Sequence, residues 1–179
     1  LSCLDIMVCL FYKFIDLKKK NRDFFLLSKG HALANLYLIM LDQKLIQKGK
    51  FFEGFNNFDL GGQLDVFKYK ELIDWNTGSL GHSLGVAIGL AIGNPKKKIW
   101  TIIGDAEIDE GSVWEALFFI SEKKINNINI IIDRNKLSAS SKVEKKEIFD
   151  KNFFKNLSLK TYIINGHNTL ELINCFSKI

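Results

Sequence analysis

Three short apolar segments, each followed by a polar turn, place the tightest limit on how this chain can fold. They lie at residues 99–103, 128–132 and 162–164 (IWTII, INIII and YII), and β-branched side chains dominate them. A stretch with helical periodicity at 112–124 separates the first two segments, and another follows the third. Buried strands that alternate with helices predict an α/β fold, in which helices flank a parallel sheet.

The rest of the chain is expected to complete a single domain covering residues 1–179. Three further stretches have helical periodicity and are expected to be helices: residues 4–17, 31–47 and 81–93. Residues 49–77 have no clear period, so we expect a long loop there that contains at most a short helix. The sequence begins without methionine and stops within a helical pattern, so we expect a fragment of a longer chain that is incomplete at both ends.

Two pairs of polar residues have the spacing of a helix-capping box. Ser112 is followed three residues later by Glu115, and Asn168 is followed in the same way by Glu171. In a capping box the first side chain accepts a hydrogen bond from the backbone of the second residue, and the second side chain reaches back. We therefore expect a helix to begin at each pair.

Composition excludes several classes of protein. With 47% hydrophobic and 25% charged residues, the chain is expected to fold rather than to remain disordered. The net charge of +5 comes from short lysine runs at the ends of apolar stretches, so we expect no nucleic-acid partner. No apolar run reaches the roughly 20 residues that span a bilayer, so no membrane partner is expected. Three cysteines without CxxC spacing fit a cytoplasmic protein, and Cys3 and Cys9, which lie in an apolar helical pattern, are interpreted as small core residues.

Five glycines punctuate the segment TGSLGHSLGVAIGLAIG. Gly78 precedes the expected helix and Gly81 stands at its start, in the segment TGSLG, so we interpret both as loop glycines that adopt positive φ or lie against a ligand. Gly85, Gly89 and Gly93 recur within the helix, and we interpret them as a stripe against which another backbone packs closely.

Asp105 and Asn135 each follow an expected strand and are 30 residues apart. A right-handed crossover between parallel strands brings the ends of those strands to the same edge of the sheet. A carboxylate and an amide oxygen in one crevice would suit Mg²⁺ or Ca²⁺. The same two residue types are also common turn formers, and the spacing alone does not choose between these interpretations.

The segment GDAEIDEGSVWEALFFISEKKINNINIIIDRNKLS resembles the motif of thiamine-diphosphate enzymes, Gly-Asp followed by an asparagine after an apolar strand. Within that superfamily the chain is most similar to the N-terminal, pyrophosphate-binding half of the transketolase family. LSKGHALANLY and NTGSLGHSLGVAIGLAIG occur in the order that this family has. The resemblance covers nearly the whole chain and implies a thiamine-diphosphate-binding fold, with thiamine diphosphate and a divalent metal as cofactors.

The resemblance also implies a role for individual residues. The implied metal ligands are Asp105, Asn135 and the backbone carbonyl of Leu137, and the implied cofactor-binding residues are His31, Gly78, Ser79, Leu80, Gly104, Ala106 and Asn135. Ala106 replaces the family's glycine, and we expect its methyl group to be tolerated if φ stays negative.

Three acids and a histidine also lie near these motifs, and of these Glu110 and His82 are candidates for a role at the site. Glu110 corresponds to a family glutamate that communicates with the activating glutamate of the other half, so we assign it a supporting catalytic role. His82 replaces a glutamine of many relatives and would line the active-site funnel. Glu107 and Asp109 are interpreted as solvated loop acids.

The resemblance implies a transferase that moves a two-carbon ketol unit between sugar phosphates. It implies the split-subunit type, in which this chain acts with a C-terminal partner subunit in a homo- or hetero-oligomer. One alternative is the α subunit of a thiamine-dependent 2-oxo acid dehydrogenase, which shares the Gly-Asp motif, although LSKGH and TGSLG favour transketolase. Another alternative is a truncated remnant without activity.

Overall fold

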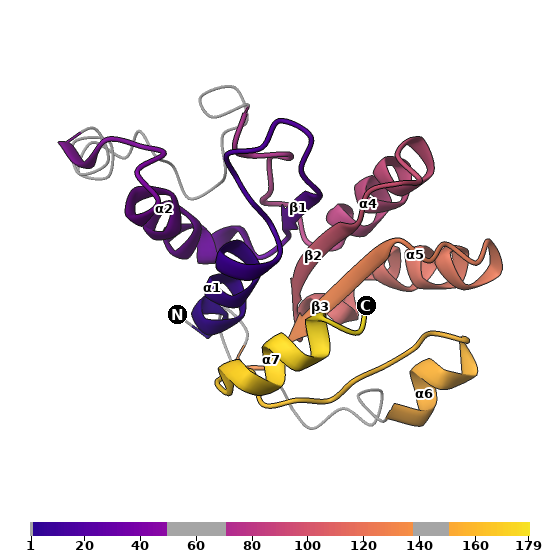
Figure 1. Cartoon of the computed structure of the whole chain (residues 1–179). Helices are drawn as coiled ribbons and strands as arrows, with labels where there is room; N and C mark the ends of the chain where they lie inside the picture. Colours follow the sequence, from indigo (N-terminus) through magenta and orange to yellow (C-terminus); the bar gives the residue numbers. More distant parts are fainter. Residues whose placement is uncertain (1, 50–70, 138–150) are drawn as a thin grey trace.

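A three-stranded parallel sheet lies between two layers of helices (Figure 1). The structure, a computed structural model, describes residues 2–49, 71–137 and 151–179. The strands stand in the order β1 (Phe24–Leu27), β2 (Ile99–Gly104) and β3 (Ile128–Asp133). Ile99 is the register partner of Phe24 on one side and of Ile128 on the other. The α/β fold with a parallel sheet and flanking helices, predicted from the sequence, is confirmed.

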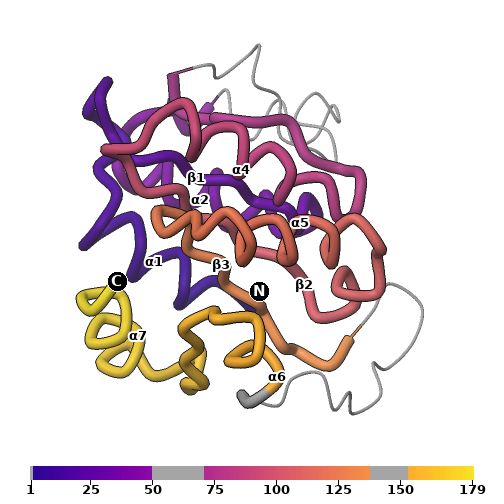
Figure 2. The backbone as a smooth tube through the Cα atoms, turned by 90° about the vertical axis from the view of Figure 1, so that its right-hand side faces the viewer, coloured from indigo at the N-terminus to yellow at the C-terminus, as the bar shows by residue number. Residues whose placement is uncertain are grey.

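Helices cover both faces of the sheet. The helices are α1 (Leu4–Lys13), α2 (Leu33–Asp42), α4 (His82–Gly93), α5 (Gly111–Glu122), α6 (Lys151–Asn156) and α7 (Thr169–Phe176), with short 3₁₀ turns η1 (Gly30–Ala32) and η2 (Glu107–Asp109). One face carries α1, α2 and α7, and the other carries α4 and α5 (Figure 1). Figure 2 shows α4 and α5 side by side on the same face of the sheet.

The alternation of side chains along β2 divides the core between the two faces. Trp100 and Ile102 join the cluster formed with α1, α2 and α7, whereas Ile99 and Ile103 face the helices of the other layer. The Trp100 ring meets Phe176 of α7 edge to face, with 5.5 Å between ring centroids. Because β2 is buried on both faces, it holds the two helix layers together.

Two expectations about strands were wrong. Residues 162–164 do not form a strand: Tyr162 and Ile164 contact the core and Ile163 is exposed, as in a strand, but within the described residues no ladder joins this segment to the sheet. The sequence analysis also missed β1, because FFLL is short and leads directly into a turn. Apolar pattern alone does not supply the backbone pairing that makes a strand.

Helix boundaries agree with expectation in part. Asn168 caps α7 by accepting a hydrogen bond from the Glu171 N–H at 3.2 Å, as predicted. Ser112 does not cap α5, which begins at Gly111 with Glu110 in the capping position and no side-chain cap. The first helix ends at Lys13, four residues earlier than expected. Residues 50–70 lie outside the described residues, and 71–77 contain no helix or strand, as the loop prediction requires.

All three cysteines are free and buried, as predicted for Cys3 and Cys9. In the part of the chain that the structure describes, no helix combines the length and the apolar character that crossing a bilayer requires. Within the described residues, the close packing expected at Gly85, Gly89 and Gly93 is not seen, because a Cβ added at any of them meets nothing within 4 Å. These glycines fall on the exposed face of α4, and the helix packs on the sheet through Leu84 and Ala87 instead.

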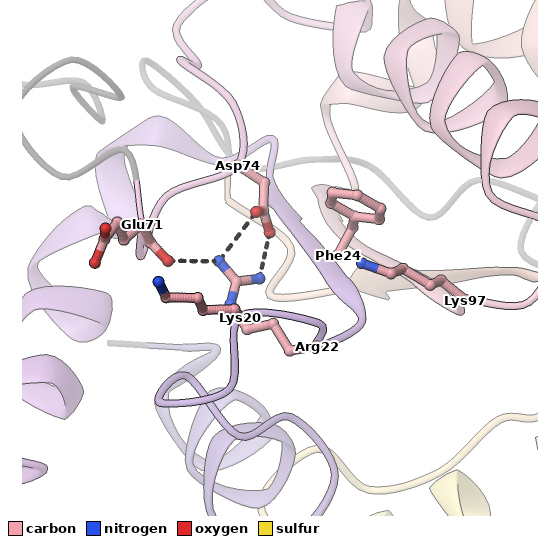
Figure 3. Close-up of a pocket in the computed structure, with 6 residues that line it drawn as sticks. All are labelled: Lys20, Arg22, Phe24, Glu71, Asp74 and Lys97. Atoms are coloured by element: carbon pink, nitrogen blue, oxygen red, sulfur yellow. Dashed lines mark hydrogen bonds and ion pairs between the residues drawn. The ribbon is translucent and has the colours of Figure 1, made fainter.

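A buried ion pair anchors the segment that leads into the 78–81 loop. The guanidinium of Arg22 donates to both carboxylate oxygens of Asp74, at 2.6 and 3.0 Å (Figure 3). It also donates to the backbone carbonyl of Leu72, at 3.0 Å. Asp74 also accepts from the N–H of Phe25 in β1. These groups adjoin a cavity of about 240 Å³ at the amino end of β1, the edge opposite the carboxyl ends of the strands.

Replacing Asp74 by asparagine should lower the free energy of unfolding by about 3 kcal/mol, because the buried Arg22 charge would lose its counter-ion. Chemical denaturation in urea would measure the loss. Asp16→Asn is the matched control, since Asp16 forms an exposed pair with Lys19 at 3.9 Å and should cost less than about 0.5 kcal/mol. Equal effects of the two substitutions would contradict an anchoring role for Asp74.

Candidate functional site

The carboxyl ends of all three strands meet at one edge of the sheet, and each leads into a polar loop. Ser28 follows β1, Asp105 follows β2, and Asn135 lies two residues beyond β3. Gly104 is the register partner of Asp133, so the last residues of β2 and β3 lie side by side. Parallel pairing therefore gathers the polar residues that the sequence placed after separate strands.

Asp105 is buried at this edge, with 2% of its surface exposed. One carboxylate oxygen accepts from the N–H of Ala106 at 2.9 Å, and the other accepts from the N–H of Lys136 at 2.7 Å. The second bond joins the end of β2 to the turn after β3. Among the described residues Asp105 forms no ion pair, so its carboxylate is held only by backbone dipoles.

The turn after β3 is shaped by Asn135. Its amide oxygen accepts from the N–H of Leu137 at 2.9 Å, and its amide nitrogen donates to the Ser2 hydroxyl at 3.1 Å. Lys136, between Asn135 and Leu137, has a φ of 62°, in the left-handed region. The structure thus brings Asp105, Asn135 and Leu137 together, the three residues that the sequence analysis named as metal ligands.

The residues predicted to bind the cofactor lie on three loops at the same edge. His31 is in η1 after β1, and its side chain is exposed. Partial desolvation, with the charge of Lys29 nearby, lowers the pKa of the His31 imidazole below its usual value. Gly78, Ser79 and Leu80 form an exposed loop before α4. Ala106 has a φ of −70°, so the condition for tolerating its methyl group is met.

The predicted supporting acid, Glu110, is half-buried at the start of α5. It adjoins Gly81, where an added Cβ would come within 2.9 Å of the Glu110 Cβ. His82 is the exposed first residue of α4 and stands beside Gly81. The loop 78–81 and the start of α5 are therefore in direct contact.

A buried ion pair and a buried acid were not predicted from the sequence. The Lys29 ammonium, within LSKGH, donates to the Asp133 carboxylate at 2.5 Å, and both side chains are almost fully buried. Glu107, interpreted above as a solvated acid, is 1% exposed, and that interpretation is wrong. Asp109, by contrast, is exposed as expected. No local signal separates Glu107 from Asp109, because burial here depends on loops that are distant in sequence.

The oxygen donors at this edge fit a hard divalent cation. A carboxylate, an amide oxygen and a backbone carbonyl are the ligands that Mg²⁺ and Ca²⁺ prefer. Within the described ranges, no group of three or more His, Cys, Asp or Glu side chains could hold a metal, so a cluster of the kind that binds Zn²⁺ is not seen there. A cation beside Asp105 would also neutralise a buried charge that only backbone groups now stabilise.

Residues 1–170 match the family described as transketolase, thiamine diphosphate binding domain. The chain is 31% identical to a transketolase of Pongo abelii, across 99% of the chain and 30% of that protein. It is 34% identical to an apulose-4-phosphate transketolase subunit of Actinobacillus succinogenes, across 78% of the chain and 54% of that protein. The chain therefore spans between about a third and about half of the length of these relatives.

Solved structures agree on the fold. A transketolase mutant from Pichia stipitis superposes with a TM-score of 0.84 at 20% identity, over 97% of this chain and 29% of that one. A transketolase from Campylobacter jejuni gives a TM-score of 0.74 at 23% identity, over 97% and 30% of the two chains. The parallel sheet with its two helix layers is thus an arrangement that these proteins share.

Gly81→Ala should destabilise the protein by about 1–3 kcal/mol, because the left-handed backbone strains any side chain. Gly81 has a φ of 78°, and an added Cβ would lie 2.3 Å from the Ser112 hydroxyl. Gly85→Ala is the control: it lies in the adjoining helix with open space around it, and it should raise stability by up to about 1 kcal/mol. Thermal unfolding of both variants measures the contrast, and a loss of stability in both would refute the loop role of Gly81.

Proposed function

This chain belongs to the transketolase family, whose thiamine diphosphate-binding domain it matches, and on that premise we propose that it forms the diphosphate-binding half of a split, transketolase-like enzyme. The enzyme would transfer a two-carbon ketol unit between sugar phosphates together with a C-terminal partner half. The similarity to proteins named as subunits of an apulose-4-phosphate transketolase supports a division of the enzyme between two chains.

One observation carries the proposal. The buried carboxylate of Asp105 is bonded to the backbone of the turn that contains Asn135 and Leu137, at the carboxyl edge of the sheet. This contact unites two segments that the family motif pairs. It also sets hard oxygen donors beside the loop 78–81 and His31, where ligands of open parallel sheets commonly bind.

At this edge Asp105, Asn135 and the carbonyl of Leu137 would hold Mg²⁺ or Ca²⁺. His31 would contact the diphosphate, whose charge the metal shares. The N–H of Ala106 would contact it in place of the Asp105 carboxylate, to which that N–H now donates, and Gly104 lies beside them at the end of β2. Gly78, Ser79 and Leu80 would support the rings of the cofactor from below. Thiamine diphosphate, when bound, supplies the nucleophilic carbon that carries the two-carbon unit.

Glu110 would act as a supporting acid that faces the partner half. The residue lies against Gly81, next to the loop assigned to the cofactor rings. A carboxylate there can hold a proton-bearing group of the partner in position. The activating glutamate itself would come from the partner, so this chain would form one wall of a shared cleft, and closing that cleft would exclude water.

Two alternatives remain as outcomes of the tests below. The α subunit of a 2-oxo acid dehydrogenase would share the Gly-Asp motif, but LSKGH, TGSLG and the family match favour transketolase. A truncated remnant would fold without binding the cofactor.

Asp105→Asn should weaken binding of thiamine diphosphate in the presence of Mg²⁺ by at least about 100-fold, since even groups that only support a metal ligand contribute roughly 10–100-fold. Titration calorimetry on the assembled protein would measure this change, with urea denaturation to show that the variant folds. Asp109→Asn, an exposed acid of the same segment, should bind as the wild type does. Unchanged affinity in Asp105→Asn would refute the metal assignment.

The isolated chain should show no ketol transfer with Mg²⁺ and thiamine diphosphate, whereas the chain mixed with its C-terminal half should be active. A half-cleft leaves the cofactor in water and lacks the activating glutamate. A ketol-transfer assay with a sugar-phosphate donor and acceptor would compare the two preparations. Equal turnover by the isolated chain would defeat the split-site proposal, and inactivity of the assembled pair that nevertheless binds cofactor would favour a different reaction.

A further inference from the structure

Glu107 is a buried acid at the centre of the candidate site. It begins the turn η2 two residues after Asp105, and its side chain is 1% exposed. Burying a carboxylate is costly unless hydrogen bonds or charges compensate for the lost water. The hydrogen-bond donors around the Glu107 carboxylate compensate for this cost, and their positions indicate the role of the residue.

Its carboxylate accepts hydrogen bonds from three separate segments. One oxygen accepts from the Ser28 hydroxyl after β1 and from the Gly81 N–H before α4, the latter at 2.8 Å. The other oxygen accepts from the Gly104 N–H at the end of β2, at 3.1 Å. Ser28 and Gly81 are 79 and 26 residues from Glu107 in sequence, so one side chain connects loops that are distant along the chain.

Each of the three segments carries residues assigned above to the cofactor. Ser28 lies three residues before His31, Gly81 ends the loop that contains Gly78, and Gly104 directly precedes Asp105. We infer that Glu107 is a positioning residue, which fixes these three loops relative to one another so that their ligands converge on the diphosphate and the metal. The inference deepens the proposed function and rests on it for the identity of the ligand.

The chemistry of the carboxylate explains why the residue is an acid. Both oxygens of an ionised carboxylate accept, so three donors are satisfied at once. A glutamine of the same size has one accepting oxygen and one donating nitrogen, so its NH₂ would face an N–H or O–H donor. Glu107→Gln therefore fills the same space but removes at least one tie between the loops.

Hydrogen exchange followed by NMR tests the ties directly, without cofactor. In Glu107→Gln at least one of the amides of Gly81 and Gly104, the one that faces the new NH₂ group, should exchange about tenfold faster or more, because a buried donor without its acceptor opens more readily. Glu122→Gln is the matched control, since its side chain is exposed at the far end of α5 and should leave both amides unchanged. Unchanged protection of Gly81 and Gly104 in Glu107→Gln would overturn the inference.

Titration of the assembled protein with thiamine diphosphate and Mg²⁺ tests the consequence. Glu107→Gln should bind about tenfold more weakly or worse. Val113→Ala, at a buried position of α5, removes core packing but none of the three hydrogen bonds to Glu107, and it should lower thermal stability while leaving affinity unchanged. This variant separates positioning from general destabilisation, so an equal loss of affinity in Val113→Ala would overturn the inference.

The two experiments distinguish this inference from the proposed function. Binding by the wild type with unchanged affinity in Glu107→Gln would remove the positioning role and leave the function intact. Failure of the wild type to bind thiamine diphosphate would overturn the proposed function, and the exchange rates of Gly81 and Gly104 alone would then decide whether Glu107 fixes the loops.

Discussion

The parallel pairing of β1, β2 and β3 is the constraint on which the other features of the molecule depend. Parallel strands need crossovers that return over a face of the sheet, so helices cover both faces and β2 is buried on both sides. The same direction of travel brings every carboxyl end to one edge. Segments that are far apart in the sequence, such as LSKGH and the Gly-Asp step, become neighbours there because the strands that precede them are paired.

That edge concentrates buried charge. Asp105, Glu107 and Asp133 are all almost fully buried, whereas Lys29 pairs with only one of them. Like charges gathered in a region of low dielectric repel one another unless cations or dipoles intervene. Backbone N–H groups donate hydrogen bonds to the carboxylates of Asp105 and Glu107. Among the described buried side chains of this edge, acids outnumber cations, which supports the divalent cation of the proposed function alongside the chemistry of the oxygen donors.

The exposed side of the α4–α5 layer contrasts with the buried edge. Gly85 and Gly89 face outward with open space around them, and Ile92 and Phe118 are more than half exposed. The expected close approach of another backbone is therefore absent from the described part of this chain. A stripe without side chains has the same sequence pattern whether its neighbour is its own sheet or lies outside the chain, so only the tertiary structure could show which side it faces.

The sequence by itself determined the class of fold, the order of the motifs and the residues after β2 and β3, because strand-forming runs and turn residues act locally. It also indicated the cap at Asn168, where both partners lie within one turn. Tertiary structure alone decided that FFLL pairs with β2 while residues 162–164 do not, since a ladder requires a partner. It alone placed Glu107 in the interior and Asp109 in solvent: whether an acid is buried depends on donors from distant loops, and those donors have no trace in the neighbouring sequence.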